Sequence, residues 1–221
     1  MEKVKVIAAP GPVSYPLIAA RDESFSINFQ KEGRADIVLD SSVSMVRRGI
    51  PIDLSLIRGL AIASPDLGKR IGIVRRGSSS EILVRAILGI QKREAEIVSV
   101  DEISSIPGMM KSGNIDSAVV PAPFGKGKTL EKILSDLGIQ VPGSCVASVR
   151  EDLVDRFTGA YSRGIDLFRR SPDESASYVS SVLPNHVSPD FIKKVIVETD
   201  VSVIQPGKHS EFTEIVRKYS Q

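Results

Sequence analysis

The chain has 221 residues, of which 42% are hydrophobic and 25% are charged, as in an ordinary globular protein. Its 29 basic and 27 acidic residues leave a formal net charge of +2, without the long basic run that nucleic-acid binding requires. The single cysteine, Cys145, excludes an intramolecular disulfide. The sequence contains no stretch of about 18 apolar residues, so it predicts no membrane-spanning helix. We therefore expect no nucleic-acid partner and no membrane insertion.

The N-terminal segment Val4–Ala9 is apolar but short, and Lys5 interrupts it. A secretory signal peptide needs a longer apolar region than this. As written, the sequence predicts a cytoplasmic protein, and an extracytoplasmic one if a leader has been removed. The sequence leaves a homodimer open.

Short strands and helices alternate through the first third of the chain. Residues 4–9 predict a strand that ends at the turn Pro10-Gly11-Pro12, and Ser14 is the expected N-cap of a helix through Ala20. The further elements expected here are strands over 26–30, 35–39 and 60–63 and a helix from about 42 to 48.

A turn at residues 64–68 opens a second series of alternating elements. We expect strands over 69–74, 96–100, 117–121 and 144–149, with helices over 81–88, 103–112 and 130–137. The remainder is predicted to be helical, over 153–170, 172–183, 189–197 and 209–219.

This alternation predicts an α/β fold with parallel sheets. Because the two series are separated at 64–68, we expect two lobes. Lobe 1 would comprise residues 1–66 plus 141–221, including the helical C-terminal part, and lobe 2 would be the inserted residues 67–140.

Three segments, in this order, resemble one known superfamily. They are Gly68-Lys-Arg-Ile-Gly-Ile-Val-Arg-Arg-Gly-Ser-Ser-Ser, then Gly113-Asn-Ile-Asp-Ser before a strand, then Gly138-Ile-Gln-Val-Pro before a strand and Arg150-Glu-Asp-Leu. Together they resemble the type II periplasmic-binding-protein-like superfamily, and most of all its nitrate/sulfonate/taurine and thiamine-precursor solute-binding branch. Ser117 stands where that family prefers alanine.

The resemblance implies a two-lobed fold with the second lobe inserted into the first. It also implies a protein that binds a small molecule, anionic or an aromatic acid, in the cleft between the lobes, as solute-binding proteins of ABC transporters do. The superfamily's fold also occurs in cytoplasmic enzymes of a menaquinone pathway, which act on chorismate- or naphthoate-type precursors. The resemblance therefore also allows this chain to be such an enzyme. Fold alone does not choose between binding protein and enzyme.

Ligands of parallel α/β sheets bind beyond the carboxyl ends of the strands. The loop Gly77-Ser78-Ser79-Ser80 is the most informative, because it combines small residues, hydroxyls and a following helix N-terminus, which suit an anion. An ordinary N-cap is its other interpretation. The full set of predicted ligand residues is Gly11, Ser14, Tyr15, Asp40, Ser41, Ser42, Gly77, Ser78, Ser79, Ser80, Pro121 and Phe124.

Several of these residues have an alternative structural interpretation. Tyr15 could stack on a ligand ring or pack as an ordinary tyrosine, and Asp40 could orient a ligand or cap a helix. Phe124 could line the cleft or pack at the hinge. If the protein is an enzyme, Asp40, Tyr15 and the serines would move the protons.

We predict no cofactor and no metal site, and we assign no catalytic residue. The two histidines, His186 and His209, show no metal-ligand spacing, and no nucleophile motif is present. Residues 122–129 fit a loosened phosphate-binding loop, but Pro123 removes a backbone donor, so we interpret them as an exposed basic turn. Cys145 is expected to be buried as a small hydrophobe.

Overall fold

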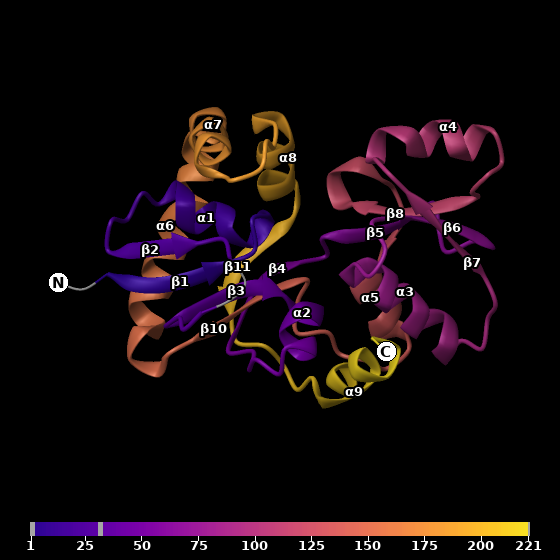
Figure 1. Cartoon of the computed structure of the whole chain (residues 1–221), viewed down its shortest axis with the longest axis horizontal. Helices are drawn as coiled ribbons and strands as arrows, with labels where there is room; N and C mark the ends of the chain where they lie inside the picture. The colour runs from indigo at the N-terminus through magenta and orange to yellow at the C-terminus, as the bar shows by residue number, and fades with distance from the viewer. Residues whose placement is uncertain (1–2, 31–32, 221) are drawn as a thin grey trace.

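The computed structural model describes residues 3–30 and 33–220 and contains two sheets, each flanked by helices (Figure 1). The first sheet has the order β11-β4-β10-β3-β1-β2. Its strands are β1 (Val4–Ala8), β2 (Phe25–Asn28), β3 (Ile37–Ser41), β4 (Leu54–Arg58), β10 (Cys145–Val149) and β11 (Asp200–Ile204).

The second sheet has the order β7-β6-β8-β5-β9. Its strands are β5 (Ala61–Ser64), β6 (Arg70–Val74), β7 (Glu96–Val100), β8 (Ser117–Pro121) and β9 (Lys128–Thr129). Because all five strands fall between β4 and β10 in the chain, the second lobe is inserted into the first, as predicted. The α/β fold class is confirmed.

Helices cover both sheets. They are α1 (Tyr15–Ala19), α2 (Ser42–Arg47), α3 (Ser79–Ile90), α4 (Ile106–Lys111), α5 (Leu130–Asp136), α6 (Val154–Arg170), α7 (Pro172–Val182), α8 (Pro189–Glu198) and α9 (Ser210–Tyr219). Four short 3-10 turns accompany them: η1 (Pro12–Ser14), η2 (Ile103–Ser105), η3 (Ala122–Phe124) and η4 (Glu151–Leu153).

Local sequence explains where the longer helices begin and which faces they bury. Ser78, Thr129 and Ser188 each accept a backbone N–H of the first turn, and so cap α3, α5 and α8. On α6 the buried residues recur at helical spacing: Phe157, Ala160, Tyr161, Gly164, Ile165 and Phe168. A side chain at Gly164 would collide with the carbonyl oxygen of Pro16, so this glycine lets α6 lie directly on α1.

The expectation of purely parallel sheets is wrong. β1 pairs in parallel with β2 and β3, but β10 runs antiparallel to both β3 and β4, and β11 antiparallel to β4. β5 likewise runs antiparallel to β8. The reason is geometric: β5 and β10 begin where the chain arrives from the other lobe, at the edge where β3 and β8 end.

The division of the chain into residues 1–66 plus 141–221 and 67–140 stays a prediction, but β5 affects it. Residues 61–64 were placed in lobe 1, whereas β5 pairs with β8 and β9 of the second sheet. The chain therefore passes between the sheets at residues 59–60, earlier than the expected break at 64–68. It returns between α5 and β10, at residues 137–144.

The C-terminal helix α9 makes a third connection between the lobes, in yellow below α2 in Figure 1. Phe212 and Val216 of α9 are completely buried in one apolar cluster with Val43 and Val46 of α2 and residues of α3. A side chain at Gly89 of α3 would collide with the hydroxyl of Tyr219, so α9 lies in close contact with α3. α9 thus joins a helix of the first lobe to a helix of the second.

We predict that Phe212→Ala lowers the free energy of unfolding by about 3–5 kcal/mol, because it leaves a cavity in a closely packed cluster. Urea unfolding followed by circular dichroism measures this change. Glu214→Ala, at an exposed position of the same helix, should stay within about 0.5 kcal/mol of wild type. Equal effects of the two substitutions would contradict the assigned role of α9.

Candidate functional site

Two of the predicted ligand loops, one from each lobe, meet in the structure. Ser41 is the last residue of β3, and Ser79, which follows the loop after β6, is the first residue of α3. Their hydroxyl oxygens lie 2.9 Å apart, although the residues are 38 positions apart in the chain. Arg47 extends the contact by donating to the carbonyl oxygen of Gly77 at 3.5 Å. We call this contact the serine seam.

On the α3 side of the seam, each predicted residue has a defined place. Ser78 is the N-cap and accepts the N–H of Glu81, as the capping interpretation requires. The Glu81 carboxylate accepts the N–H of Gly77 at 2.7 Å and binds Arg85. Ser79 and Ser80 lie in the first helical turn, where backbone N–H groups have no acceptor within the helix.

Charge around this end of α3 is predominantly basic. Arg47, Arg75 and Arg76 are all exposed there. Although burial acts against it, hydrogen bonds from Arg85 and Gly77 hold the pKa of Glu81 below its ordinary value. Glu81 is therefore ionised, with its charge balanced by Arg85.

On the α2 side, Ser41 is the N-cap and accepts the N–H of Ser44 at 3.1 Å. Asp40 is buried, and its carboxylate accepts from the Ser44 hydroxyl at 2.6 Å and from Arg48 at 3.3 Å. Ser42 is buried and donates its N–H to the carbonyl oxygen of Ser144. Ser41 therefore carries the hydroxyl that reaches the other lobe, whereas Asp40 and Ser42 are engaged within the first.

The loop after β1 is more enclosed than we expected. Ser14 occupies the N-cap position of α1, as predicted, but its hydroxyl forms no capping hydrogen bond and donates instead to the carbonyl oxygen of Gly11 at 2.9 Å. Tyr15 is only 1% exposed and belongs to the first lobe's core, which agrees with the packed alternative. Burial also raises the pKa of its hydroxyl, with a smaller contribution from Cys145.

The loop after β8 reaches the first lobe through an aromatic contact. Pro121 ends β8, and Phe124 stacks on Phe191 of α8 with ring centroids 5.3 Å apart. The prediction singled out Phe124 but missed Phe191. No local pattern marks that residue, because its significance comes from packing against a loop 67 positions away.

A hydrogen-bonded group holds the two passages between the lobes together. Ser144 donates its N–H to the carbonyl oxygen of Ile57 at 2.8 Å, and its hydroxyl accepts the N–H of Leu60 at 3.0 Å. The same hydroxyl donates to the carboxylate of Glu131 in a short hydrogen bond, and Glu131 also accepts from the backbone of Gly59. Glu131, on α5, thus binds both passages.

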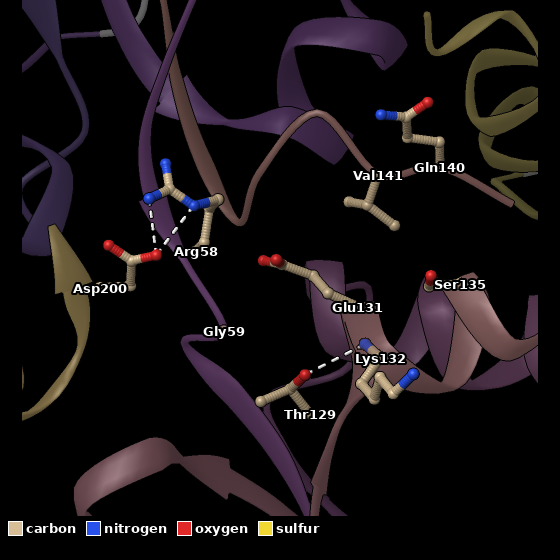
Figure 2. A pocket seen from close by; sticks show the side chains of 9 residues that line it. All are labelled: Arg58, Gly59, Thr129, Glu131, Lys132, Ser135, Gln140, Val141 and Asp200. Carbon is tan, nitrogen blue, oxygen red and sulfur yellow. Dashed lines mark hydrogen bonds and ion pairs between the residues drawn. The ribbon is translucent and has the colours of Figure 1, made fainter. Parts of the chain in front are cut away.

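Beside this group lies a pocket of about 350 Å³, which the sequence did not predict (Figure 2). Side chains from both lobes and from both passages line it: Arg58, Gly59, Thr129, Glu131, Lys132, Ser135, Gln140, Val141 and Asp200. Arg58 binds Asp200 through Nε and Nη2, at 2.9 and 2.5 Å from Oδ2. Lys132 is paired with Asp136. Each of these charged side chains therefore has a protein partner, but the buried Nη1 of Arg58 has no hydrogen-bond partner among the residues that the structure describes.

Other predictions concern chemistry away from the seam. Cys145 is buried, as expected, and burial together with the charges of Asp40 and Glu131 raises the pKa of its thiol. Within residues 3–30 and 33–220, no three His, Cys, Asp or Glu side chains are grouped closely enough to hold a metal ion. No helix in the described part of the chain is long and apolar enough to cross a membrane.

Comparisons with known proteins agree with this architecture. A family model described as "Protein of unknown function (DUF3834)" matches residues 1–202. No curated protein sequence matches the chain. A structure from Thermoplasma volcanium, provisionally named a nitrate transport protein, is 24% identical, with a TM-score of 0.73 over 98% of this chain and 91% of that one.

An ABC transporter structure from Parabacteroides distasonis is 13% identical, with a TM-score of 0.59 over 99% of this chain and 93% of that one. At these identities the likeness shows the fold. The chain has the two-lobed fold of type II periplasmic-binding proteins, as the sequence resemblance predicted.

We predict that Glu131→Gln changes how stability depends on pH. Burial raises the pKa of Glu131, although Ser144 and Gly59 favour the charged form. A carboxyl whose pKa rises on folding contributes its full stability below the ordinary pKa of 4.5, and that contribution is lost as the pH rises through the folded-state pKa. Glutamine keeps the acceptor but does not titrate.

Urea unfolding of both proteins from pH 4 to pH 8 tests this. The wild type should lose stability relative to Glu131→Gln as the pH rises. Glu102→Gln, at an exposed position, serves as the control. A difference that stays constant over the whole range would refute the prediction.

Proposed function

The chain belongs to the DUF3834 family of proteins of unknown function, and from that starting point we propose that it binds a small anionic solute between its two lobes. The observation that carries this proposal is the serine seam, where the hydroxyl of Ser41 at the end of β3 and the hydroxyl of Ser79 at the start of α3, one in each lobe, lie 2.9 Å apart. A solute held here would touch both lobes at once, and two-lobed binding proteins close around ligands in this manner.

The chemistry of the seam favours an anion. The Ser79 and Ser80 N–H groups stand at the positive end of α3, a helix of 12 residues. The Ser41 and Ser79 hydroxyls can donate to an oxyanion once they no longer bond each other. The exposed arginines beside the loop attract negative charge. A carboxylate, sulfonate or inorganic oxyanion matches this donor set.

The physiological setting we propose is solute uptake through an ABC transporter. Two structures that share the fold over nearly the whole chain are named for nitrate transport and as an ABC transporter. An extracytoplasmic location would accompany this role, and a cytoplasmic location would argue against it.

We do not propose the enzyme alternative on chorismate- or naphthoate-type precursors. It relied on Asp40 and Tyr15 for proton transfer. The Asp40 carboxylate is bound by Ser44 and Arg48, and Tyr15 is buried in the core of the first lobe.

A thermal-shift panel tests the proposed function. It contains nitrate, sulfate, phosphate, taurine, dicarboxylates, amino acids and chorismate-type aromatic acids. A specific ligand at one hundred times its Kd stabilises the folded state by about 2.7 kcal/mol, which is roughly 5–10 °C in Tm for a chain of this size. A panel in which no compound shifts the Tm would contradict the proposal.

Ser79→Ala then locates the site. We expect the affinity for the best panel compound to fall by roughly 10-fold or more, because a hydrogen bond to a charged group is lost. Ser79 is the cleaner position to change, since Ser41 also caps α2. Isothermal titration calorimetry gives the Kd, with exposed Ser181→Ala on α7 as the control. Unchanged affinity in Ser79→Ala would show that the ligand does not bind at the seam.

A further inference from the structure

The lobes touch at a second place, formed by two phenylalanines. Phe124 belongs to η3, which follows β8 of the second lobe, and Phe191 belongs to the first turn of α8. Their ring planes differ by 11° and their centroids lie 5.3 Å apart, the geometry of an offset stack. Phe124 was predicted to contact the ligand, but its ring instead packs against the opposite lobe.

Each ring is held by its own lobe. The buried residues Ile192 and Ile196 fix α8 in the core of the first lobe. Phe124 is the last residue of η3, which directly follows β8, the central strand of the second sheet. Because neither ring belongs to a passage between the lobes, their contact is made only when the lobes are close together.

Lys194 adds to the contact from the same helix as Phe191. Its ammonium lies 5.9 Å from the centroid of the Phe124 ring, while it also pairs with Asp190 at 3.0 Å. A cation near an aromatic face adds a small electrostatic attraction. Both aromatic and cationic groups of α8 therefore favour the same position of Phe124.

The strength of this contact suits a reversible closure. Phe124 remains 38% exposed, so the stack hides only part of each ring. Aromatic pairs of this kind change an equilibrium by about 2- to 10-fold. An effect of this size favours closed lobes, and the contact is still weak enough for thermal motion to break it.

We propose that Phe124 and Phe191 form an interlobe latch, which favours the closed arrangement and controls access of the solute to the serine seam. The proposal rests on the proposed function, and it assigns Phe124 to closure instead of to direct ligand contact. Removing either ring opens the lobes, without removing any hydroxyl of the seam.

Distances between the lobes in the absence of solute test the latch. Spin labels at Glu23→Cys in the first lobe and Lys111→Cys in the second, both exposed, are introduced in a Cys145→Ala background. Double electron–electron resonance then gives the populations of shorter and longer distances. Phe124→Ala and Phe191→Ala should each raise the ratio of longer to shorter by about 2- to 10-fold, and the double variant should add little to either.

Val197→Ala is the matched control, because it shortens an exposed apolar side chain on the same helix. It should reproduce the parent distances. The latch is overturned if both single variants give parent distances, or if the double variant gives the product of two independent effects. A change in Phe191→Ala alone would show local damage to α8, and would also overturn it.

The same labelled proteins separate this inference from the proposed function. Sodium nitrate, sodium sulfate and taurine are added to each in turn. If none of them shortens the distance while the two phenylalanine variants still open the lobes, the latch stands and the proposed anionic solutes fail. In the opposite outcome, both variants give the parent distances without solute, and a compound then closes the lobes equally in all three proteins. In that case the latch fails and solute binding stands.

Discussion

Ser144 stands where the chain re-enters the first lobe, and its hydrogen bonds reach both lobes. Its backbone binds Ile57 and Ser42 of the first lobe, while its hydroxyl binds the N–H of Leu60 and the carboxylate of Glu131. The two passages are thereby fixed side by side. This also sets the direction of β10, which starts at the edge where β3 and β4 end. Because Ser42 follows Ser41, the position of the serine seam depends on the same group.

The three interlobe connections outside the passages differ in kind. The serine seam is polar, the phenylalanine stack is half exposed, and the cluster of α2, α3 and α9 is apolar and completely buried around Phe212. Separating the first two costs little, whereas separating the third exposes a core. A rotation that separates the lobes at the seam and at the stack while α9 keeps its contacts is therefore the least costly motion of the lobes.

Much of this arrangement was predictable because its signals are local. The strand over 96–100 and the strand over 117–121 appear with the predicted bounds, and the caps at Ser78 and Thr129 follow from the residues alone. Glycine and serine after β6 singled out a segment that contacts the other lobe through Ser79, while its contact with a ligand stays a prediction. The inserted second lobe followed from the order of elements together with the family resemblance.

The missed features depend on partners far apart in the chain. β11 has the alternating pattern Asp-Val-Ser-Val-Ile but was passed over among helices, and β4 is a short apolar run after a proline. Tyr15 looks like a loop tyrosine in the sequence, but packing buries it in the first lobe's core. Glu131 resembles any exposed helical glutamate until the returning chain places Ser144 against it. Each of these outcomes is decided by tertiary packing.

The position of α9 also has a consequence for the order in which the protein is made. Residues 61–136 leave the ribosome well before residues 210–219, and domains generally fold as they emerge. The face of α3 that receives Phe212 and Val216 must therefore stay uncovered until residues 210–219 have been made. Helix α9, beyond the 1–202 stretch that the family model matches, thus completes a lobe whose other parts were made much earlier.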